Sequence, residues 1–345
     1  MTIGIHSLGV QLRNLIDGAY PSFGQTYFVV DSDFRTQAQG WSRPDGTGPL
    51  DLAEERRPNK GGINYVYRTG DFASDAACLQ AAHDAAIAFR GDAIFFTPGA
   101  LSLAAVVNVT TESLRLIGPQ VNYPLQARTS ITAAIADAVS IAATCDDMEL
   151  AFLKLIPLTN ASWSVVSGAC NRGYWHDFTY DANGVAGSTA TSMVNVTGAA
   201  LDWRFDNFAF LTDAAQAALI ITGGDPLRLQ ISNFRHWHML GVSPIGLLEV
   251  NGTATFGLDV GPGVGIVTGT TSAVTTLIDI ADQAASTSGH GVIHDFIGSD
   301  YATATTLVTL AGATAEFRMH NCRFATVDSA ATTTALFHVG SLYTG

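Results

Sequence analysis

The sequence predicts an all-β fold in which short parallel strands stack as the coils of a solenoid. One alternating apolar segment recurs along the chain and is usually followed by a small residue and Gly, as in Val194-Asn195-Val196-Thr197-Gly198. Its anchors are Ile141, Val166, Val196, Ile221, Val250, Ile280, Leu310 and Val339, at intervals of 25, 30, 25, 29, 30, 30 and 29 residues. A nearly fixed period of this length, without helical periodicity, indicates one repeat per coil.

A second alternating segment lies between the anchors and ends in an amide or a carboxylate followed by Phe. Its copies are His176-Asp177-Phe178, Asp206-Asn207-Phe208, Ser232-Asn233-Phe234 and His294-Asp295-Phe296, with His320-Asn321-Cys322 as a degenerate copy. Turn-forming residues separate the segments, so each repeat holds at least two strands. Stacked coils place equivalent side chains about 4.8 Å apart, which predicts interior columns of Val, Ile and Leu.

One helix is expected over residues 75–90, directly before the coils. Its apolar residues are spaced to form one buried stripe and are Cys78, Leu79, Ala82, Ala86 and Phe89. Ser74 or Asp75 would cap its first turn, and Gly91 would end it. We expect the helix to cover the open end of the solenoid, because unpaired strand edges need protection. A strand is expected to follow at residues 93–96.

The start of the solenoid resembles a known family. Residues 70–75 with the Ala-rich helix, residues 95–99 and residues 114–118 resemble the opening of pectate-lyase-like right-handed β-helices, and residues 178–184 look like the family's strand followed by a DGNG turn. The resemblance implies a right-handed single-stranded parallel β-helix with an N-terminal cap helix. Because the family includes polysaccharide lyases, hydrolases, phage tailspikes and inert virion proteins, it implies little about activity. Residues 38–52 also resemble a segment that precedes such helices in virion proteins of tailed bacteriophages.

Residues 1–69 lack the repeat and are expected to form a non-repetitive N-terminal arm, ahead of a β-helix domain over residues 70–345. One strand is expected within the arm, at residues 26–30. The arm is interpreted either as a flexible or cap-forming leader or as an attachment segment that docks on another virion protein. Segments rich in Pro and Gly suit the second role, since they lose less backbone freedom when they become ordered.

The composition excludes several classes of partner. The chain has 30 acidic and 17 basic residues, a net charge of −13, and only two lysines, Lys60 and Lys154. Without a basic cluster we expect no binding to nucleic acid and no docking on an anionic membrane. A hydrophobic fraction of 47% with 14% charged residues excludes a disordered chain.

The cysteines and the absence of long apolar runs in the sequence predict a protein made and kept in a reducing cytoplasm, or released from it by lysis. Cys78, Cys145, Cys170 and Cys322 are far apart and are expected to be buried thiols, with no disulfide or zinc site. No run of 18 apolar residues and no signal peptide is found in the sequence, so we expect a protein made in the cytoplasm.

The candidate catalytic residues are the carboxylates Asp177, Asp181, Asp202, Asp206 and Asp213. Glycoside hydrolysis needs two carboxyl groups about 5–5.5 Å or 6.5–9.5 Å apart, which neighbouring coils can supply. However, Asp177 aligns with Asn207 in the next repeat, and alternation is expected to place Asp206 on the opposite side of that column. We therefore assign no catalytic residue; Asp177, Asp181 and Asp206 are candidates only if the chain is an enzyme.

Other polar side chains also receive structural interpretations. The column Asp177, Asn207, Asn233, Asp295 and Asn321 is expected to be a ladder that satisfies the backbone groups of turns. Arg204, Arg228 and Arg235 lie in neighbouring coils but lack the dense Asp cluster of a lyase, so surface or interface roles are expected. The histidines are expected at the surface or between subunits, because a zinc site needs three or four converging ligands. They are His176, His236, His238, His294 and His320.

The leading functional hypothesis is a non-enzymatic structural protein of a tailed-phage virion, a homotrimer that serves as capsid decoration or as a tail-associated fibre or spike. It would assemble in the host cytoplasm and bind other virion proteins through residues 1–69, without cofactor or metal. Two alternatives stay open. One is a tailspike-like glycoside hydrolase or polysaccharide lyase acting on bacterial surface polysaccharide. The other is a carbohydrate-binding receptor module that would use surface aromatics such as Trp163, Trp175, Trp203 and Trp237, although packing or interface roles are favoured for these residues.

Overall fold

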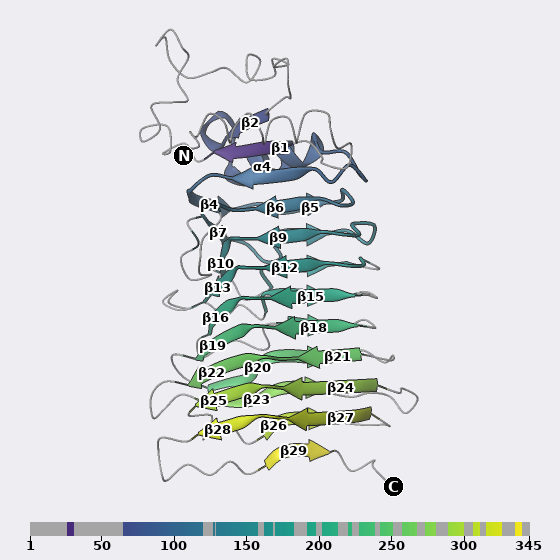
Figure 1. The fold of residues 1–345 in the computed structure, drawn as a ribbon. Coiled ribbons are helices and arrows are strands. Elements are labelled where there is room, and N and C mark those ends of the chain that lie inside the picture. The colour runs from purple at the N-terminus through teal and green to yellow at the C-terminus, as the bar shows by residue number, and fades with distance from the viewer. Residues whose placement is uncertain are drawn as a thin grey trace, which may run out of the picture.

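The strands of the protein form three parallel sheets that run along a stack of coils, so the chain folds as an all-β parallel β-helix (Figure 1). The structure is a computed structural model. It describes residues 26–30, 65–119, 127, 129–157, 162–167, 170–182, 192–197, 202–212, 220–222, 228–238, 242–250, 257–267, 273–280, 289–299, 306–310, 315–325 and 335–339. The fold class predicted from the repeat is confirmed.

Sheet A has eleven strands, all paired in parallel. In spatial order they are β2 (Tyr65–Arg68), β1 (Thr26–Val30), β3 (Ala93–Phe96), β6 (Arg115–Ile117), β9 (Glu149–Ala151), β12 (Tyr174–His176), β15 (Trp203–Asp206), β18 (Leu229–Ser232), β21 (Gly257–Val260), β24 (Gly289–His294) and β27 (Ala315–His320).

Sheets B and C have nine strands each, and from β3 onward the strands follow one another along the chain in the order A, B and C. Sheet B consists of β4 (Gly99–Leu103), β7 (Thr129–Ala133), β10 (Lys154–Pro157), β13 (Thr179–Asp181), β16 (Ala209–Thr212), β19 (Phe234–His238), β22 (Gly263–Val267), β25 (Phe296–Ser299) and β28 (Arg323–Ala325). Sheet C consists of β5 (Val107–Val109), β8 (Val139–Ile141), β11 (Ser164–Val166), β14 (Val194–Val196), β17 (Ile220–Thr222), β20 (Val242–Val250), β23 (Ala273–Ile280), β26 (Thr306–Leu310) and β29 (Ala335–Val339).

The repeat anchors form one register column on sheet C, with one exception. Ile141, Val166 and Val196 are Cα partners on successive strands. The next partner of Val196 is Thr222, and Thr222 pairs with Val250, so the predicted anchor Ile221 is wrong by one residue. Ile220 and Ile221 are both apolar, and the alternation of the segment therefore does not fix its register.

A column of phenylalanine rings follows the corner between sheets A and B inside the coils. Phe178 and Phe208 stack at 4.9 Å between ring centroids and 2° between planes, and Phe208 stacks on Phe234 at 6.0 Å. The next coil has Gly263 in this register position, and the ring of Phe296 beyond it lies 5.7 Å from Phe234. The second sequence pattern thus marks a buried aromatic stack, which adds to the apolar burial that holds the coils together.

The expected helix exists as α4 (Asp75–Asp84) and covers the N-terminal end of the stack, directly after the 3-10 turn η1 (Thr69–Asp71) (Figure 1). Ser74 is its N-cap, and the Ser74 hydroxyl accepts a hydrogen bond from the amide of Ala77 at 3.2 Å. Helix side chains also satisfy edge-strand amides: Asp75 accepts from Ser102 of β4 at 2.7 Å and Gln80 from Asn108 of β5 at 2.7 Å. The helix therefore protects the first strands of sheets B and C from further pairing.

α4 is shorter than the predicted helix, which extended to residue 90. The Tyr27 hydroxyl donates to the carbonyl of Ala85 at 2.6 Å, and the carboxylate of Asp92 accepts from the amide of Ile87 at 2.8 Å. These contacts from sheet A bend the chain away from the helix axis. As a result Phe89, which was expected in the buried stripe, has a positive φ of 61° and is 78% exposed.

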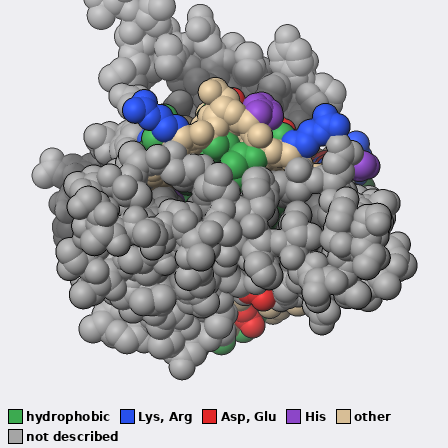
Figure 2. Space-filling model, turned by 90° about the horizontal axis from the view of Figure 1, so that it is seen from below, with side chains coloured by type: hydrophobic (Ala, Val, Ile, Leu, Met, Phe, Trp, Pro, Cys, Tyr) green, Lys and Arg blue, Asp and Glu red, His purple; other side chains and the backbone are tan. Residues whose placement is uncertain are grey.

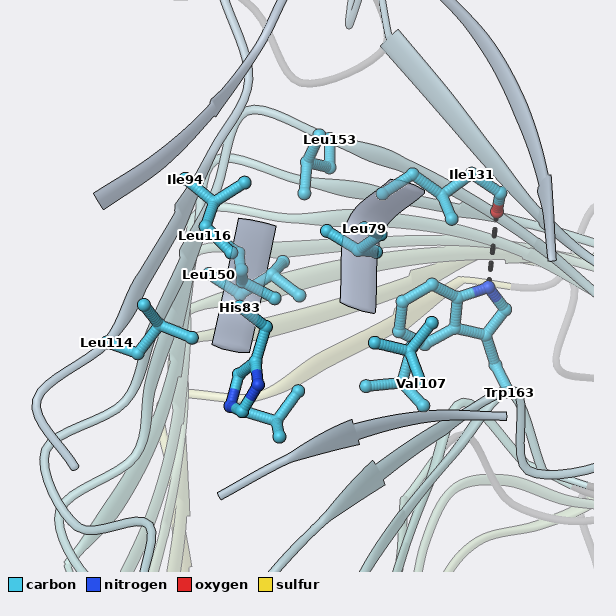
Figure 3. Close-up of a pocket in the computed structure, with 12 residues that line it drawn as sticks. Leu79, His83, Ile94, Val107, Leu114, Leu116, Ile131, Leu150, Leu153 and Trp163 are labelled. Carbon is cyan, nitrogen blue, oxygen red and sulfur yellow. Dashed lines mark hydrogen bonds between the residues drawn. The ribbon is translucent and has the colours of Figure 1, made fainter. Parts of the chain in front are cut away.

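Beneath α4 the interior of the first coils is apolar and almost filled (Figure 3). Leu79 and His83 of the helix face Ile131, Leu150 and Trp163 of the coils around a cavity of about 10 Å³. This volume leaves room for one water molecule at most, so the cavity is a packing gap rather than a ligand site.

Two strands of the predicted N-terminal arm belong to the β-helix. β1 was predicted and lies between β2 and β3, with Tyr27 opposite Ile94 and Val29 opposite Phe96. The proposed boundary at residue 69 therefore runs through sheet A, because residues 26–30 and 65–68 are part of it. The rest of residues 1–64, including residues 38–52, lies outside the described residues.

The thiols of Cys78, Cys145 and Cys170 are free and buried as predicted, whereas Cys322 is only half-buried. Burial, with a smaller contribution from Asp75 and Asp71, raises the pKa of Cys78 to about 12. Such a thiol is unreactive at neutral pH.

Candidate functional site

The outer face of sheet A carries several of the polar side chains that the sequence singled out. One register column on this face reads Arg115, Glu149, Tyr174, Arg204, Gln230 and Asp259 along successive strands. A second column, two residues further along each strand, contains His176, Asp206 and Ser232. The alternating inward residues, such as Trp175 and Phe205, are completely buried.

The predicted polar ladder lies at the corner where sheet A ends. Asp177, Asn207, Asn233, Asp295 and Asn321 all have positive φ, between 47° and 53°. The side-chain amide of Asn207 donates to Asp177, and that of Asn321 donates to Asp295. Asn and Asp tolerate the left-handed conformation and bond across coils there, which explains their choice at this corner.

Asp206 lies beside this ladder and not on the opposite side, so that expectation is wrong. Its carboxylate accepts hydrogen bonds from the hydroxyl of Ser232 at 2.7 Å and from the amide of Asn233 at 2.8 Å. The left-handed residue at each corner interrupts the strand alternation on which the expectation depended. Burial acts to raise the pKa of Asp206, but these hydrogen bonds outweigh it and leave the pKa below its ordinary value.

The other candidate carboxylates lie elsewhere. Asp181 is on sheet B, where its carboxylate pairs with the Lys154 ammonium at 2.6 Å. Asp202 precedes β15 and accepts a hydrogen bond from Arg228 Nη2 at 2.7 Å. Asp213 lies outside the described residues.

Two histidines on sheet A each bridge two carboxylates. His176 has Nδ1 2.6 Å from Asp177 Oδ2 and Nε2 3.0 Å from Glu149 Oε1. His294 has Nδ1 2.8 Å from Asp295 Oδ2 and Nε2 3.1 Å from Asp259 Oδ1. Burial acts to lower the pKa of His176, but hydrogen bonds to Glu149 and Asp177 raise it above its ordinary value.

An open groove of about 430 Å³ crosses the start of three neighbouring strands of sheet A, β15, β18 and β21. Its polar lining consists of Asp202, Arg204, Arg228, Gln230 and Asp259. Arg228 pairs with Asp202, and the Arg204 guanidinium lies 5.2 Å from the centroid of the Tyr174 ring. The position beside Arg228 on the next strand, β21, is Gly257, which contributes no side chain to the groove. The groove therefore presents guanidinium, carboxylate and amide groups at coil spacing, about 4.8 Å apart.

Several aromatic and histidine side chains for which the sequence left a surface role open are buried. Trp163, Trp175 and Trp203 are buried, and only Trp237 is half-exposed, so a carbohydrate surface built from these tryptophans is ruled out. His236 is also buried and stacks on Phe210 at 4.2 Å between centroids and 7° between planes. The side chain of His238 lies outside the described residues.

The C-terminal coils expose basic side chains. Arg318, His320 and Arg323 of β27 and β28 are exposed, and the end view shows cationic and histidine side chains across the narrow described band (Figure 2). Arg235, in contrast, is half-buried on sheet B.

Within the described residues, no group of three or more His, Cys, Asp or Glu side chains is arranged to hold a metal ion. Over the same part of the chain, none of the helices combines the length and the apolarity needed to cross a bilayer.

Comparison with known proteins yields fold similarity alone. No protein-family model matches the chain, and no curated protein matches it. One similar solved structure is the A-module of the mannuronan C-5 epimerase AlgE4 of Azotobacter vinelandii, with 11% identity, a TM-score of 0.31, and coverage of 79% of this chain and 98% of that one. Another is the catalytic domain of Agl-KA, with 11% identity, a TM-score of 0.33, and coverage of 85% and 70%. At this level of similarity, the function has to be argued from the site itself.

Proposed function

We propose that the chain is a non-enzymatic structural protein of a tailed-phage particle. The observation that carries the proposal is that each candidate catalytic carboxylate within the described residues is engaged in a different structural contact. These carboxylates are Asp177, Asp181, Asp202 and Asp206. Asp177 bridges His176 and Asn207, Asp181 pairs with Lys154, and Asp206 accepts from Ser232 and Asn233. An ionised, multiply bonded Asp206 is a poor general acid, since glycosidases need one carboxyl group with a raised pKa. The resemblance of residues 38–52 to virion proteins supports the phage setting.

The proposed assembly is a homotrimer attached to the particle, as capsid decoration or as part of a tail fibre or spike. Because β1 and β2 are strands of sheet A, a deletion of residues 1–69 would remove part of the fold together with the arm. The attachment role is therefore assigned to the parts of residues 1–64 outside β1. Locating the full chain in purified particles by imaging tests the setting.

We expect no cleavage when the purified full-length protein is incubated with the surface polysaccharide of the host. The measurement is the release of new reducing ends or of unsaturated ends over time. An active tailspike of the same host serves as the positive control. Turnover that is lost in Asp177→Asn or Asp206→Asn would establish the enzymatic alternative.

A second candidate function, glycan recognition without cleavage, is favoured by the groove on sheet A. A volume of about 430 Å³ is in the range of small-molecule sites. Planar groups such as those of Arg228 and Gln230 can each bond two neighbouring hydroxyl groups, and their pairing with Asp202 and Asp259 holds them in place.

Arg228→Ala is expected to weaken glycan binding about tenfold or more, because it removes a charged hydrogen-bond donor. Calorimetric titration with host oligosaccharides measures the effect. Arg172→Ala is the matched control: Arg172 is also exposed and paired with an Asp, Asp147, but lies outside the groove. Equal affinity of the Arg228 variant and the wild type would remove the groove as the binding site.

A further inference from the structure

The same three-residue arrangement occurs twice on the outer face of sheet A, four strands apart in the stack. In both copies a histidine ends its strand, the following Asp adopts the left-handed corner conformation, and a carboxylate comes from the preceding strand. The first copy is Glu149, His176 and Asp177, and the second is Asp259, His294 and Asp295. The four nitrogen–oxygen distances lie between 2.6 and 3.1 Å.

This geometry has a chemical requirement. An ionised carboxylate only accepts hydrogen bonds, and a neutral imidazole donates from only one of its two nitrogens. Both contacts of each histidine are hydrogen bonds only when the ring carries two protons. With one proton fewer, a nitrogen lone pair faces a carboxylate oxygen and that contact becomes repulsive.

Each arrangement connects three successive coils. Glu149 belongs to the coil before His176, and Asn207 of the following coil donates to Asp177. In the second copy, Asp259 precedes His294, and Asn321 of the following coil donates to Asp295. Asp259 also lines the groove, and Tyr174, which stacks on His176 at 4.3 Å, lies under Arg204 at the other side of the groove.

We propose that His176 and His294 are proton-dependent clasps, which tie neighbouring coils of sheet A together while protonated and release them as the pH rises. Release of Asp259 by His294 would change the charge presented in the groove. That consequence for ligand binding rests on the proposed function of the groove, whereas the clasps do not depend on it.

The surroundings of His176 favour the charged ring. His176 faces the carboxylates of Glu149 from β9 and of Asp206, its Cα partner, from β15. Asp177 and Tyr174 of its own coil also face the ring. The positive charge of Arg204 acts against protonation of the ring.

The second histidine has a more mixed environment. His294 faces Asp259 from β21 and Asp295, while His320 of β27 stacks on it at 5.5 Å and Arg318 lies on the same strand. The hydrogen bond with His294 is the main cause that lowers the pKa of Asp295.

The sign of the pH dependence follows from these shifts. Because folding raises the pKa of His176, its stabilisation is complete below the ordinary histidine value of about 6.5 and is lost as the pH rises through the folded pKa. Because folding lowers the pKa of Asp295, its stabilisation is present above the ordinary Asp value and is lost as the pH falls through the folded pKa. The clasps are therefore strongest in the weakly acidic range.

The test uses the full-length protein without any ligand, so that a failure of glycan binding does not affect it. Histidine-selective ¹³C labelling at Cε1 gives the titration midpoint of each ring, and the thermal midpoint Tm is measured between about pH 5.5 and 9. We expect the His176 signal to titrate above 6.5, and Tm to fall as the ring deprotonates. The protection factors of the Asp177 and Asn207 amides against hydrogen exchange, which are corrected for the intrinsic effect of pH, should fall over the same range.

In His176→Gln/His294→Gln the fall of Tm with pH should be lost, whereas His290→Gln, an exposed histidine on β24, should behave as the wild type. If the double variant does not fold, Asp177→Asn supplies the test, because Asn keeps the corner conformation and should lower the His176 midpoint. An unchanged pH dependence in the double variant, or a His176 midpoint that Asp177→Asn does not move, would overturn the proposal.

Discussion

Val196→Asp is expected to prevent folding of the β-helix. Val196 is 3% exposed and lies in the inward column of sheet C, between Val166 and Thr222 as Cα partners. A carboxylate there either loses its hydration without a partner or is protonated by a pKa shift of several units. Together with the lost apolar burial, this costs about 5 kcal/mol or more, a large part of the stability of a typical domain.

The adjacent Thr197→Asp is the matched control. Thr197 is exposed, and its hydroxyl contributes one hydrogen bond, to the carbonyl of Val166 at 3.1 Å. Its replacement should cost about 1 kcal/mol. Soluble yield and the urea midpoint compare the two variants, and equal behaviour would show that the register of β14 is not the one described.

The fold was predictable because two sequence patterns, the period of the apolar segments and the positions of the corner residues, mark the same repeating coil. The end of the helix was not predictable, because a tertiary contact sets it. Tyr27 bonds to Ala85, 58 residues away, and ends α4 at a point where the local sequence still favours helix. Such a contact is visible only once β1 is known to lie beside β3.

The candidate site was only partly predictable. Its residues were singled out, but they were considered as separate classes of carboxylates, arginines and histidines. The two His-Asp-Phe corners carried a usable signal, since each also has an acidic residue on the preceding strand, Glu149 or Asp259. Packing roles were favoured for the tryptophans, and Trp163, Trp175 and Trp203 are buried. The alternative of a shared exposed face depended on the 28-residue spacing of Trp175 and Trp203, whereas the register pairs Trp175 with Phe205. Successive residues of a strand point alternately inward and outward, and this alternation, not the sequence spacing alone, decides which aromatic residues are exposed.

Gly261→Ala is expected to destabilise the protein more than Gly263→Ala, although both substitutions add one methyl group at the same corner. Gly261 has a φ of 142°, and an added Cβ would lie 2.0 Å from the carbonyl oxygen of His294 on the neighbouring strand. An added Cβ at Gly263 would lie 2.3 Å from the ring of Phe234. A side-chain ring can shift, whereas a backbone carbonyl held in a parallel sheet moves only if the coils separate.

Both changes reduce the conformational entropy of the unfolded chain, so the larger cost expected for Gly261→Ala comes from the folded state, where the clash and the positive φ act together. We expect Gly263→Ala to cost about 1–3 kcal/mol and Gly261→Ala more than this. The measurement is the urea midpoint at constant m value. A Gly261→Ala protein as stable as Gly263→Ala would contradict the close approach of β21 and β24 at this corner, and with it the tight stacking of coils that places Asp259 within reach of His294.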